Sequence, residues 1–123
     1  MNNTEVVNTT SKYIVKTTGA GSETNEVLVN AETELIGGTT GSKVSLIECY
    51  YLIEGTGTLT ISAASETETQ AAGKTVAKPL SLTGKGKYGL RPNQLKYGND
   101  KIIKLTTDSN VKSYLLVTEF RRN

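Results

Sequence analysis

The chain has 123 residues, a formal net charge of +2, one cysteine and no histidine. It therefore lacks the commonest general base and the commonest metal ligand, and one cysteine cannot form an intrachain disulfide or a cysteine-rich zinc site. No window approaches the roughly 20 apolar residues of a membrane helix, and the polar start MNNTEVVNTTSK lacks signal-peptide features. We expect one domain, made in the cytoplasm, with no catalytic, cofactor or metal site.

The composition favours β-structure. Threonine is unusually frequent, and Leu, Val and Ile supply nearly all of the apolar bulk. β-Branched residues fit a pleated strand and are mediocre helix formers. Seven to nine short segments at intervals of about ten residues, with turn residues between them, are typical of a β-sandwich or barrel. We predict an all-β sandwich whose wiring is jelly-roll-like or immunoglobulin-like, since the pattern leaves both open.

The N-terminal residues 1–11 are polar and show no sustained periodicity. Because such a segment is too polar to join an apolar core, we predict a short, extended, flexible arm there, and a single β-sandwich domain over residues 12–123. Val6 and Val7 form a short apolar pair in this arm. We expect that pair to become ordered against a partner.

Apolar patterns with a period of two residues predict the strands of the domain. The predicted strands, in chain order, cover residues 12–17, 26–30, 43–53, 57–63, 75–77, 80–83, 87–90, 101–106 and 112–120. A long connection precedes residue 43, and a polar loop covers residues 64–74. The expected core side chains are Ile14, Val29, Leu46, Leu59, Ile61, Ile103, Leu105, Leu116 and Phe120.

Two connections have the composition of hairpin turns. The sequence EGTG (54–57) separates residues 43–53 from 57–63, and TDSN (107–110) separates the last two predicted strands. Short loops of this composition commonly join paired antiparallel strands, so we predict a hairpin at each place. In TLTISA, Leu59, Ile61 and Ala63 alternate with hydroxyl residues, which predicts one core face and one open face.

The last predicted strand alternates in the same way. Its two faces carry, respectively, Tyr114, Leu116, Thr118 and Phe120, and Leu115, Val117 and Glu119. The single cysteine, Cys49, lies in the apolar stretch VSLIECYYLI. We predict a buried and chemically quiet thiol there.

Charge is divided unevenly along the chain. Residues 1–73 hold three lysines and nine glutamates, a net of 3 − 9 = −6, and residues 74–123 hold eleven basic and three acidic residues, a net of 11 − 3 = +8. A folded sandwich can interleave its two halves and cancel this asymmetry. Alternatively, the protein has one acidic and one basic side suited to docking.

Two short motifs could indicate ligand binding. GKGKYG (84–89) fits G-x-G-x-x-G by letter, but a proline follows it closely where a dinucleotide site needs a helix, so the glycines are expected to serve a turn or a bulged strand. A nucleic-acid patch could combine Lys85, Lys87, Arg91, Lys96 and Lys101 with Tyr88 and Tyr97, but the pI of 8.6 falls short of the usual basic signature. A basic rim for protein docking fits equally well.

Carboxylate pairs for acid–base chemistry are also poorly supported. Glu66 and Glu68 lie in the polar loop, and Asp100 and Asp108 flank one predicted strand with no apolar pocket in view. The sequence predicts no enzyme.

Three segments suggest a family. SKYIVKTTGAGSETNEVLVN, GSKVSLIECYYLIEGTGTLTIS and LTTDSNVKSYLLVTEFRRN resemble the small β-sandwich virion proteins of tailed bacteriophages, of the kind that decorate or cement capsids, marine phages above all. The resemblance covers most of the chain after residue 11, and it carries no catalytic or ligand motif.

This resemblance implies a non-enzymatic virion protein, assembled in the host cytoplasm, that binds the outer head surface and bridges major capsid subunits. Its partners would be the major capsid protein and copies of itself, with a trimer favoured, and neither a membrane nor nucleic acid is expected. Candidate contacts are Val6, Val7, Lys85, Lys87, Arg91 and Lys96. The alternative is a tail or tail-fibre adsorption module that binds host glycans, which needs an exposed aromatic cluster drawn from Tyr50, Tyr51, Tyr88 and Tyr97.

Overall fold

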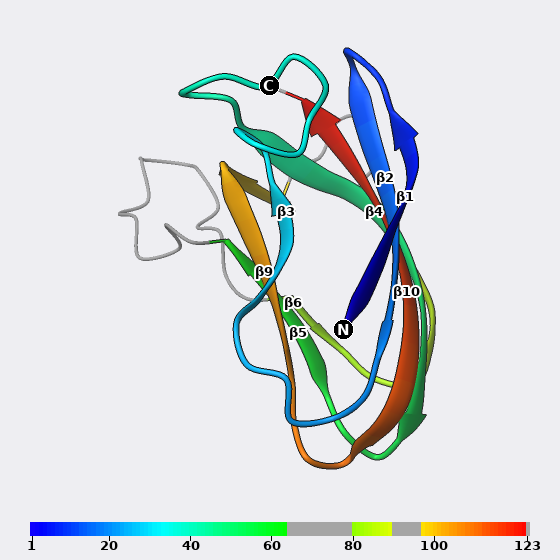
Figure 1. Cartoon of the computed structure of the whole chain (residues 1–123). Coiled ribbons are helices and arrows are strands. Elements are labelled where there is room, and N and C mark those ends of the chain that lie inside the picture. The colour runs from blue at the N-terminus through cyan, green and yellow to red at the C-terminus, as the bar shows by residue number, and fades with distance from the viewer. Residues whose placement is uncertain (64–79, 90–96, 123) are drawn as a thin grey trace, which may run out of the picture.

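A computed structural model describes residues 1–63, 80–89 and 97–122 of the chain. Within these residues the protein is all-β, and its strands form two antiparallel sheets that pack face to face (Figure 1). The fold class predicted from the sequence is confirmed. The predicted strand over residues 75–77 and the polar loop over 64–74 lie outside the described residues.

The larger, six-stranded sheet has the order β1-β2-β10-β4-β7, and β8 pairs with β4 beyond the end of β7. The smaller sheet has the order β3-β9-β5-β6. The strands of the larger sheet are β1 (Asn2–Asn8), β2 (Lys12–Gly19), β4 (Val44–Gly55), β7 (Lys85–Gly89), β8 (Tyr97–Asp100) and β10 (Val111–Arg122). Those of the smaller sheet are β3 (Glu26–Asn30), β5 (Leu59–Ala63), β6 (Leu80–Leu82) and β9 (Ile102–Thr107).

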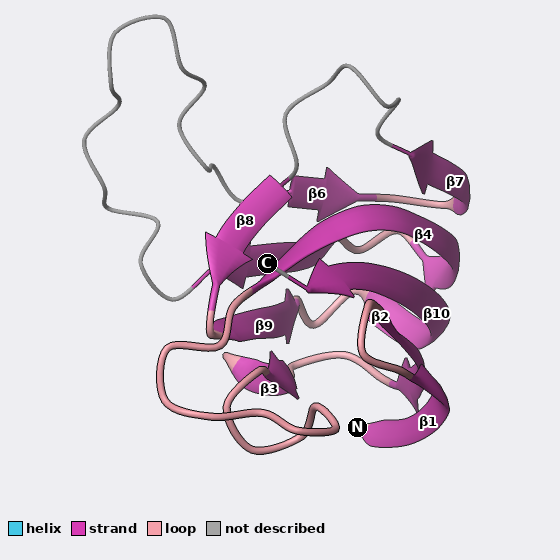
Figure 2. Cartoon of the chain, turned by 90° about the horizontal axis from the view of Figure 1, so that it is seen from above, coloured by secondary structure: helices cyan, strands magenta, loops and turns pink. Residues whose placement is uncertain are grey.

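The chain crosses repeatedly from one sheet to the other (Figure 2). β2, β4 and β10 alternate along the sequence with β3, β5 and β9 of the opposite sheet. The four-strand orders β2-β10-β4-β7 and β3-β9-β5-β6 form the double-sheet arrangement of a jelly roll, to which β1 and β8 are additions. Of the two wirings that the sequence leaves open, the structure has the jelly roll.

The two predicted hairpins are wrong. β4 and β5 lie in different sheets, as do β9 and β10, so each connection is a crossover between the sheets. Gly55 has a φ of 99°, and a side chain at Gly57 would collide with the backbone of Val111 and the carboxylate of Asp108. The glycines thus allow two crossovers to pass close together. Because a hairpin turn also requires glycine, the two kinds of connection have the same local composition.

Asp108 joins these two crossovers. Its carboxylate accepts hydrogen bonds from the backbone N–H groups of Thr58 at 3.0 Å and Asn110 at 2.9 Å. Its backbone carbonyl accepts from the N–H groups of Ser22 and Val111. Since three connections between the sheets meet at this residue, Asp108 has a structural role at one end of the sandwich.

The N-terminal segment is an edge strand and not the free arm expected from its polarity. β1 pairs antiparallel with β2 along most of its length, with a bulge between Glu5 and Val7. The Asn3 carboxamide donates to the carbonyls of Val27 at 3.3 Å and Leu28 at 3.5 Å, and its oxygen accepts from the buried Thr17 hydroxyl at 2.7 Å. Backbone pairing and polar side chains hold this strand, and neither leaves a hydrophobic pattern in the sequence.

A second asparagine fixes the other end of β1. Asn8 donates through its side-chain nitrogen to the Glu34 carbonyl at 3.0 Å and accepts from the Ile36 N–H at 2.9 Å. In the turn that follows, the Thr9 hydroxyl accepts from the backbone N–H groups of Ser11 and Lys12. β1 is therefore fastened to the long connection between β3 and β4 as well as to β2.

The core lies between the two sheets and confirms all of the predicted core side chains except Ile14. On β2 the inward side chains are Tyr13, Val15 and Thr17, while Ile14 is only half-buried. The stretch Tyr13, Ile14, Val15 is apolar at three successive positions, so period alone could not tell which face points inward. Cys49 is fully buried, as predicted.

The uneven charge along the chain is interleaved in space. β10 lies between β2 and β4, and β9 lies between β3 and β5, so each sheet mixes strands from the acidic and the basic half of the sequence. The described residues therefore do not form one acidic and one basic sheet.

We predict that Asn3→Ala destabilises the fold by about 1–3 kcal/mol, because it leaves the buried Thr17 hydroxyl without its acceptor and removes two bonds to β3. Urea denaturation of the variant measures the change. Asn2→Ala, at an exposed neighbouring position, is the matched control and should stay within about 0.5 kcal/mol of the parent. Equal stability of the two variants would contradict the anchoring role of Asn3.

Cys49 yields a second prediction. Burial raises the pKa of its thiol to about 11, although a hydrogen bond from the Tyr88 backbone opposes the shift. A thiol reagent at pH 8 should label the native protein far more slowly than the urea-unfolded protein. Because the folded-state pKa is raised, the neutral Cys49 thiol stabilises the folded state fully below the unfolded thiol pKa of about 8.5. This stabilisation is lost as the pH rises through about 11. Rapid native labelling would show that the thiol is accessible.

Candidate interaction surface

The outward face of the larger sheet carries apolar side chains at its centre. Tyr50 and Leu52 project from β4 and are 51% and 44% exposed, and Leu115 of the neighbouring β10 is 36% exposed. Val117 of β10 is half-buried on the same face. In the strand register Leu115 lies opposite Leu52 and Val117 lies opposite Tyr50, so the four side chains form a block two strands wide. We call these four residues the apolar stripe.

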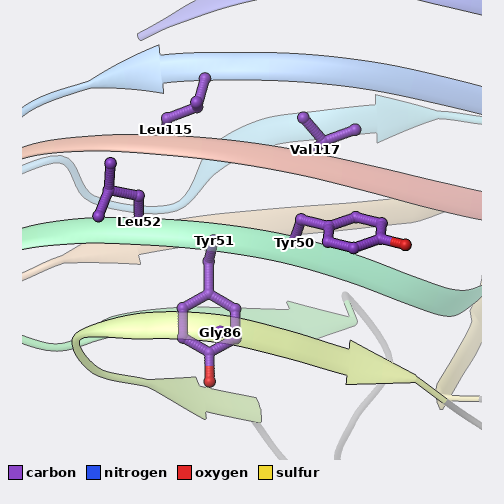
Figure 3. A pocket seen from close by; sticks show the side chains of 6 residues that line it. All are labelled: Tyr50, Tyr51, Leu52, Gly86, Leu115 and Val117. Atoms are coloured by element: carbon purple, nitrogen blue, oxygen red, sulfur yellow. The ribbon is translucent and has the colours of Figure 1, made fainter.

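The apolar stripe contains a hollow of about 250 Å³ (Figure 3). Its lining consists of the four stripe residues together with Tyr51 and Gly86. No described element crosses this face of the sheet (Figure 1). An antiparallel sheet needs only one covered face, so an open apolar depression on its other face is a candidate interaction site.

Charged neighbours order the aromatic member of the stripe. The Lys87 ammonium lies over the Tyr50 ring, 5.2 Å from its centroid, and 3.4 Å from the Glu48 carboxylate. Hydrogen bonding to the Tyr50 side chain is the main cause that lowers the pKa of Glu48; desolvation opposes it, and the Lys87 charge adds to the lowering. Hydrogen bonding to Tyr50, and then the charge of Glu48, raise the pKa of Lys87. Tyr50 is thus held in place by a small network on the surface.

Lysines border the apolar stripe on both sides. Lys16 of β2 lies opposite Val117, while Lys85 and Lys87 of β7 lie opposite Leu52 and Tyr50. All three lysines are exposed. The face therefore combines an apolar centre with two cationic flanks.

The structure places the sequence-predicted contact residues at the two edges of this same sheet. Val6, 57% exposed at the bulge, and Val7 belong to β1, whereas Lys85 and Lys87 belong to β7. The strands β2, β10 and β4 separate the two pairs, so the structure does not bring them into contact. Arg91 and Lys96 lie outside the described residues.

Sequence reasoning missed the stripe itself, although a signal was present. Residues 49–53, CYYLI, are apolar at every position, which is typical of strands covered on both faces. In the last strand the alternation already set Leu115 and Val117 apart from the core face. Two neighbouring strands with apolar residues on both faces predict a covered outer surface, but their adjacency could not be read from the sequence.

The carboxylate pairs that the sequence analysis considered and found poorly supported do not come together among the described residues. Asp100 and Asp108 lie at opposite ends of β9, and the Asp108 carboxylate binds backbone N–H groups. Glu66 and Glu68 lie outside the described residues. In the part of the chain that the structure describes, no three His, Cys, Asp or Glu side chains gather to hold a metal, and no helix could span a membrane.

The tyrosines do not form an aromatic cluster within the described residues. Tyr50 points outward, whereas Tyr51 and Tyr88 pack against the core. The side chain of Tyr97 lies outside the described residues. Because Tyr88 faces the core, it does not interleave with the lysines of β7 as a nucleic-acid patch would require.

The glycines of GKGKYG serve a turn and a strand, as predicted. Gly84 has a φ of 68° and precedes β7, and a side chain at Gly86 would contact the Tyr51 hydroxyl at 3.0 Å. β7 follows directly where a dinucleotide site needs a helix.

No protein-family model and no curated protein matches the chain. Among solved structures, a cupin domain from Bordetella pertussis Tohama I is similar, with 10% sequence identity and a TM-score of 0.41, over 99% of this chain and 92% of that chain. A similarity of this size carries no argument about activity or ligands.

The face assignment yields a third prediction. Leu115 and Leu116 are neighbours on β10, one on the apolar stripe and one fully buried. Leu115→Ala should change the free energy of unfolding by no more than about 0.5 kcal/mol, whereas Leu116→Ala should cost about 2–5 kcal/mol through the cavity it leaves. Urea denaturation of both variants tests this. A large cost at Leu115 would mean that the stripe serves the fold.

Proposed function

We propose that the protein is a non-enzymatic virion structural protein, a capsid decoration protein that docks on the outer head surface and bridges major capsid subunits. The observation that carries the proposal is the apolar stripe with its lysine flanks, on a sheet face that none of the described elements covers. Burying such a face against another protein removes apolar area from water, which favours binding by about 25 cal/mol per Å² of buried area. A face of this kind suits a chain whose work is binding.

The fold is compatible with this proposal without selecting it. Jelly rolls occur in viral capsid proteins, lectins and cupins, so function depends on the site that each one carries. Here the surface offers an apolar centre and positive charge, a combination that suits a protein partner. A sugar-binding surface would instead offer an aromatic platform on which the sugar stacks. The proposal also agrees with the sequence resemblance to phage decoration proteins.

Partners on the particle would be the major capsid protein and further copies of this chain, with a trimer favoured. A protein present in many copies multiplies a weak individual contact, because each docked copy favours the intact assembly. Val6, exposed at the β1 bulge on the far edge of the sheet, is available for a second contact. One copy could then touch two neighbours through different edges of one sheet.

A co-sedimentation assay tests the proposal with capsids stripped of the protein. The parent should sediment with the capsids, and the double variant Leu52→Ser, Leu115→Ser should bind at least tenfold more weakly, because it removes the apolar centre of the face. Ile36→Ser is the matched control, since Ile36 is 55% exposed away from the stripe. It should bind like the parent.

Salt and the β1 edge provide two further readouts. Binding should weaken between low and high salt, because exposed lysine contacts are screened. Val6→Ser should weaken binding only if β1 contributes a second contact. If the stripe variant sediments as well as the parent, the face is not the docking surface and the proposal fails.

A further inference from the structure

The flanks of the apolar stripe define the shape of what it can bind. Lys16 stands on β2, and Lys87 stands in the same cross-strand row on β7, with Val117 and Tyr50 between them. Four adjacent strands separate these lysines by three strand spacings, about 14 Å. We call this face the trough: the hollowed apolar stripe is its floor, and the exposed lysines on β2 and on β7 are its two walls.

An α-helix fits this trough. A helix with its side chains is about 10–12 Å across, so it can lie along β10 and β4 with both of its flanks next to a lysine. An extended strand is narrower and would reach one wall at a time. The floor spans two cross-strand rows, about 7 Å along the strands, which matches apolar side chains from two successive helical turns.

The charge of the trough determines which residues are expected on the two flanks of the docked helix. The lysine walls favour carboxylates on both sides of the apolar stripe of the partner. At one end of the trough Glu119 and Glu48 lie opposite each other, so the carboxylates of the partner are expected beside the lysines and not at that end. A second copy of this face, packed with aligned strands, would place its own lysines over these lysines.

We propose that the occupant of this face is an acidic amphipathic helix, which docks its apolar side on Tyr50, Leu52, Leu115 and Val117 and its carboxylates on Lys16, Lys85 and Lys87. The inference deepens the proposed function, on which it rests, because it names the partner chemistry of the same face. The mode of recognition is a helix lying in an apolar groove, read by side chains that recur every three or four residues.

Two designed peptides of about 18 residues test the inference, a length at which helices become stable enough to study. Both carry leucines at helical spacing, flanked by glutamates in the first peptide and by lysines in the second. Titration into ¹⁵N-labelled protein should shift amide resonances of β2, β10, β4 and β7 with the acidic peptide only. Fluorescence anisotropy with labelled peptides gives the dissociation constants.

Charge reversal supplies the matched controls. Lys16→Glu combined with Lys85→Glu changes one residue on each wall and should weaken the acidic peptide at least tenfold while improving the lysine peptide. Lys104→Glu, on β9 of the opposite sheet, should change neither. This exchange of preference separates a charge-selective trough from a merely sticky apolar surface.

Several results would overturn the inference. They are no binding of the acidic peptide, equal binding of both peptides, tighter association with anionic lipid vesicles, or concentration-dependent self-association blocked by Leu115→Ser. If the parent binds stripped capsids but not the acidic peptide, only this inference fails. If the parent binds the acidic peptide but not the stripped capsids, the proposed function fails and the inference about the partner of this face is retained.

Discussion

The fold depends on one strand, β10, which is hydrogen-bonded along most of its length to β2 on one side and β4 on the other. Its inward side chains, Tyr114, Leu116, Thr118 and Phe120, are all buried in the core. Its partner strands, β2 and β4, come from the first half of the chain, so each pairing closes a long loop. The entropy of loop closure is lost before the contacts between the strands offset it. Without β10 the larger sheet would divide into two unconnected parts, one containing β2 and the other containing β4.

The same strand pair that organises the core also builds the surface. β4 and β10 bury Cys49 and Leu116 on one face and present Leu52 and Leu115 on the other. Since the position of the stripe is set by backbone register, its side chains stand on rigid strands and need no loop to order them. A one-residue slip would send the apolar stripe inward and the core outward, so packing of the core fixes the binding face.

Polar side chains complete what apolar packing leaves open. Asn3 connects the edge strand of one sheet to β3 of the other, and Asp108 ties the crossovers at one end of the sandwich. Both act by satisfying backbone groups where strands end or lie at an edge. Such residues contribute no periodic pattern, although each specifies which segments lie side by side.

The sequence by itself determined the all-β class and the inward face of most strands, because a period of two is a local property of each segment. It placed Leu59, Ile61 and Leu116 in the core, and it failed at Ile14, where apolar residues on both sides remove the alternation. Only the tertiary structure decided which strands pair. The turn residues around Gly55 and Asp108 have the same composition whether the chain folds back as a hairpin or crosses to the other sheet. The polar β1 is held by contacts distant in sequence, and the apolar stripe exists because β4 and β10 become neighbours across about sixty residues of chain.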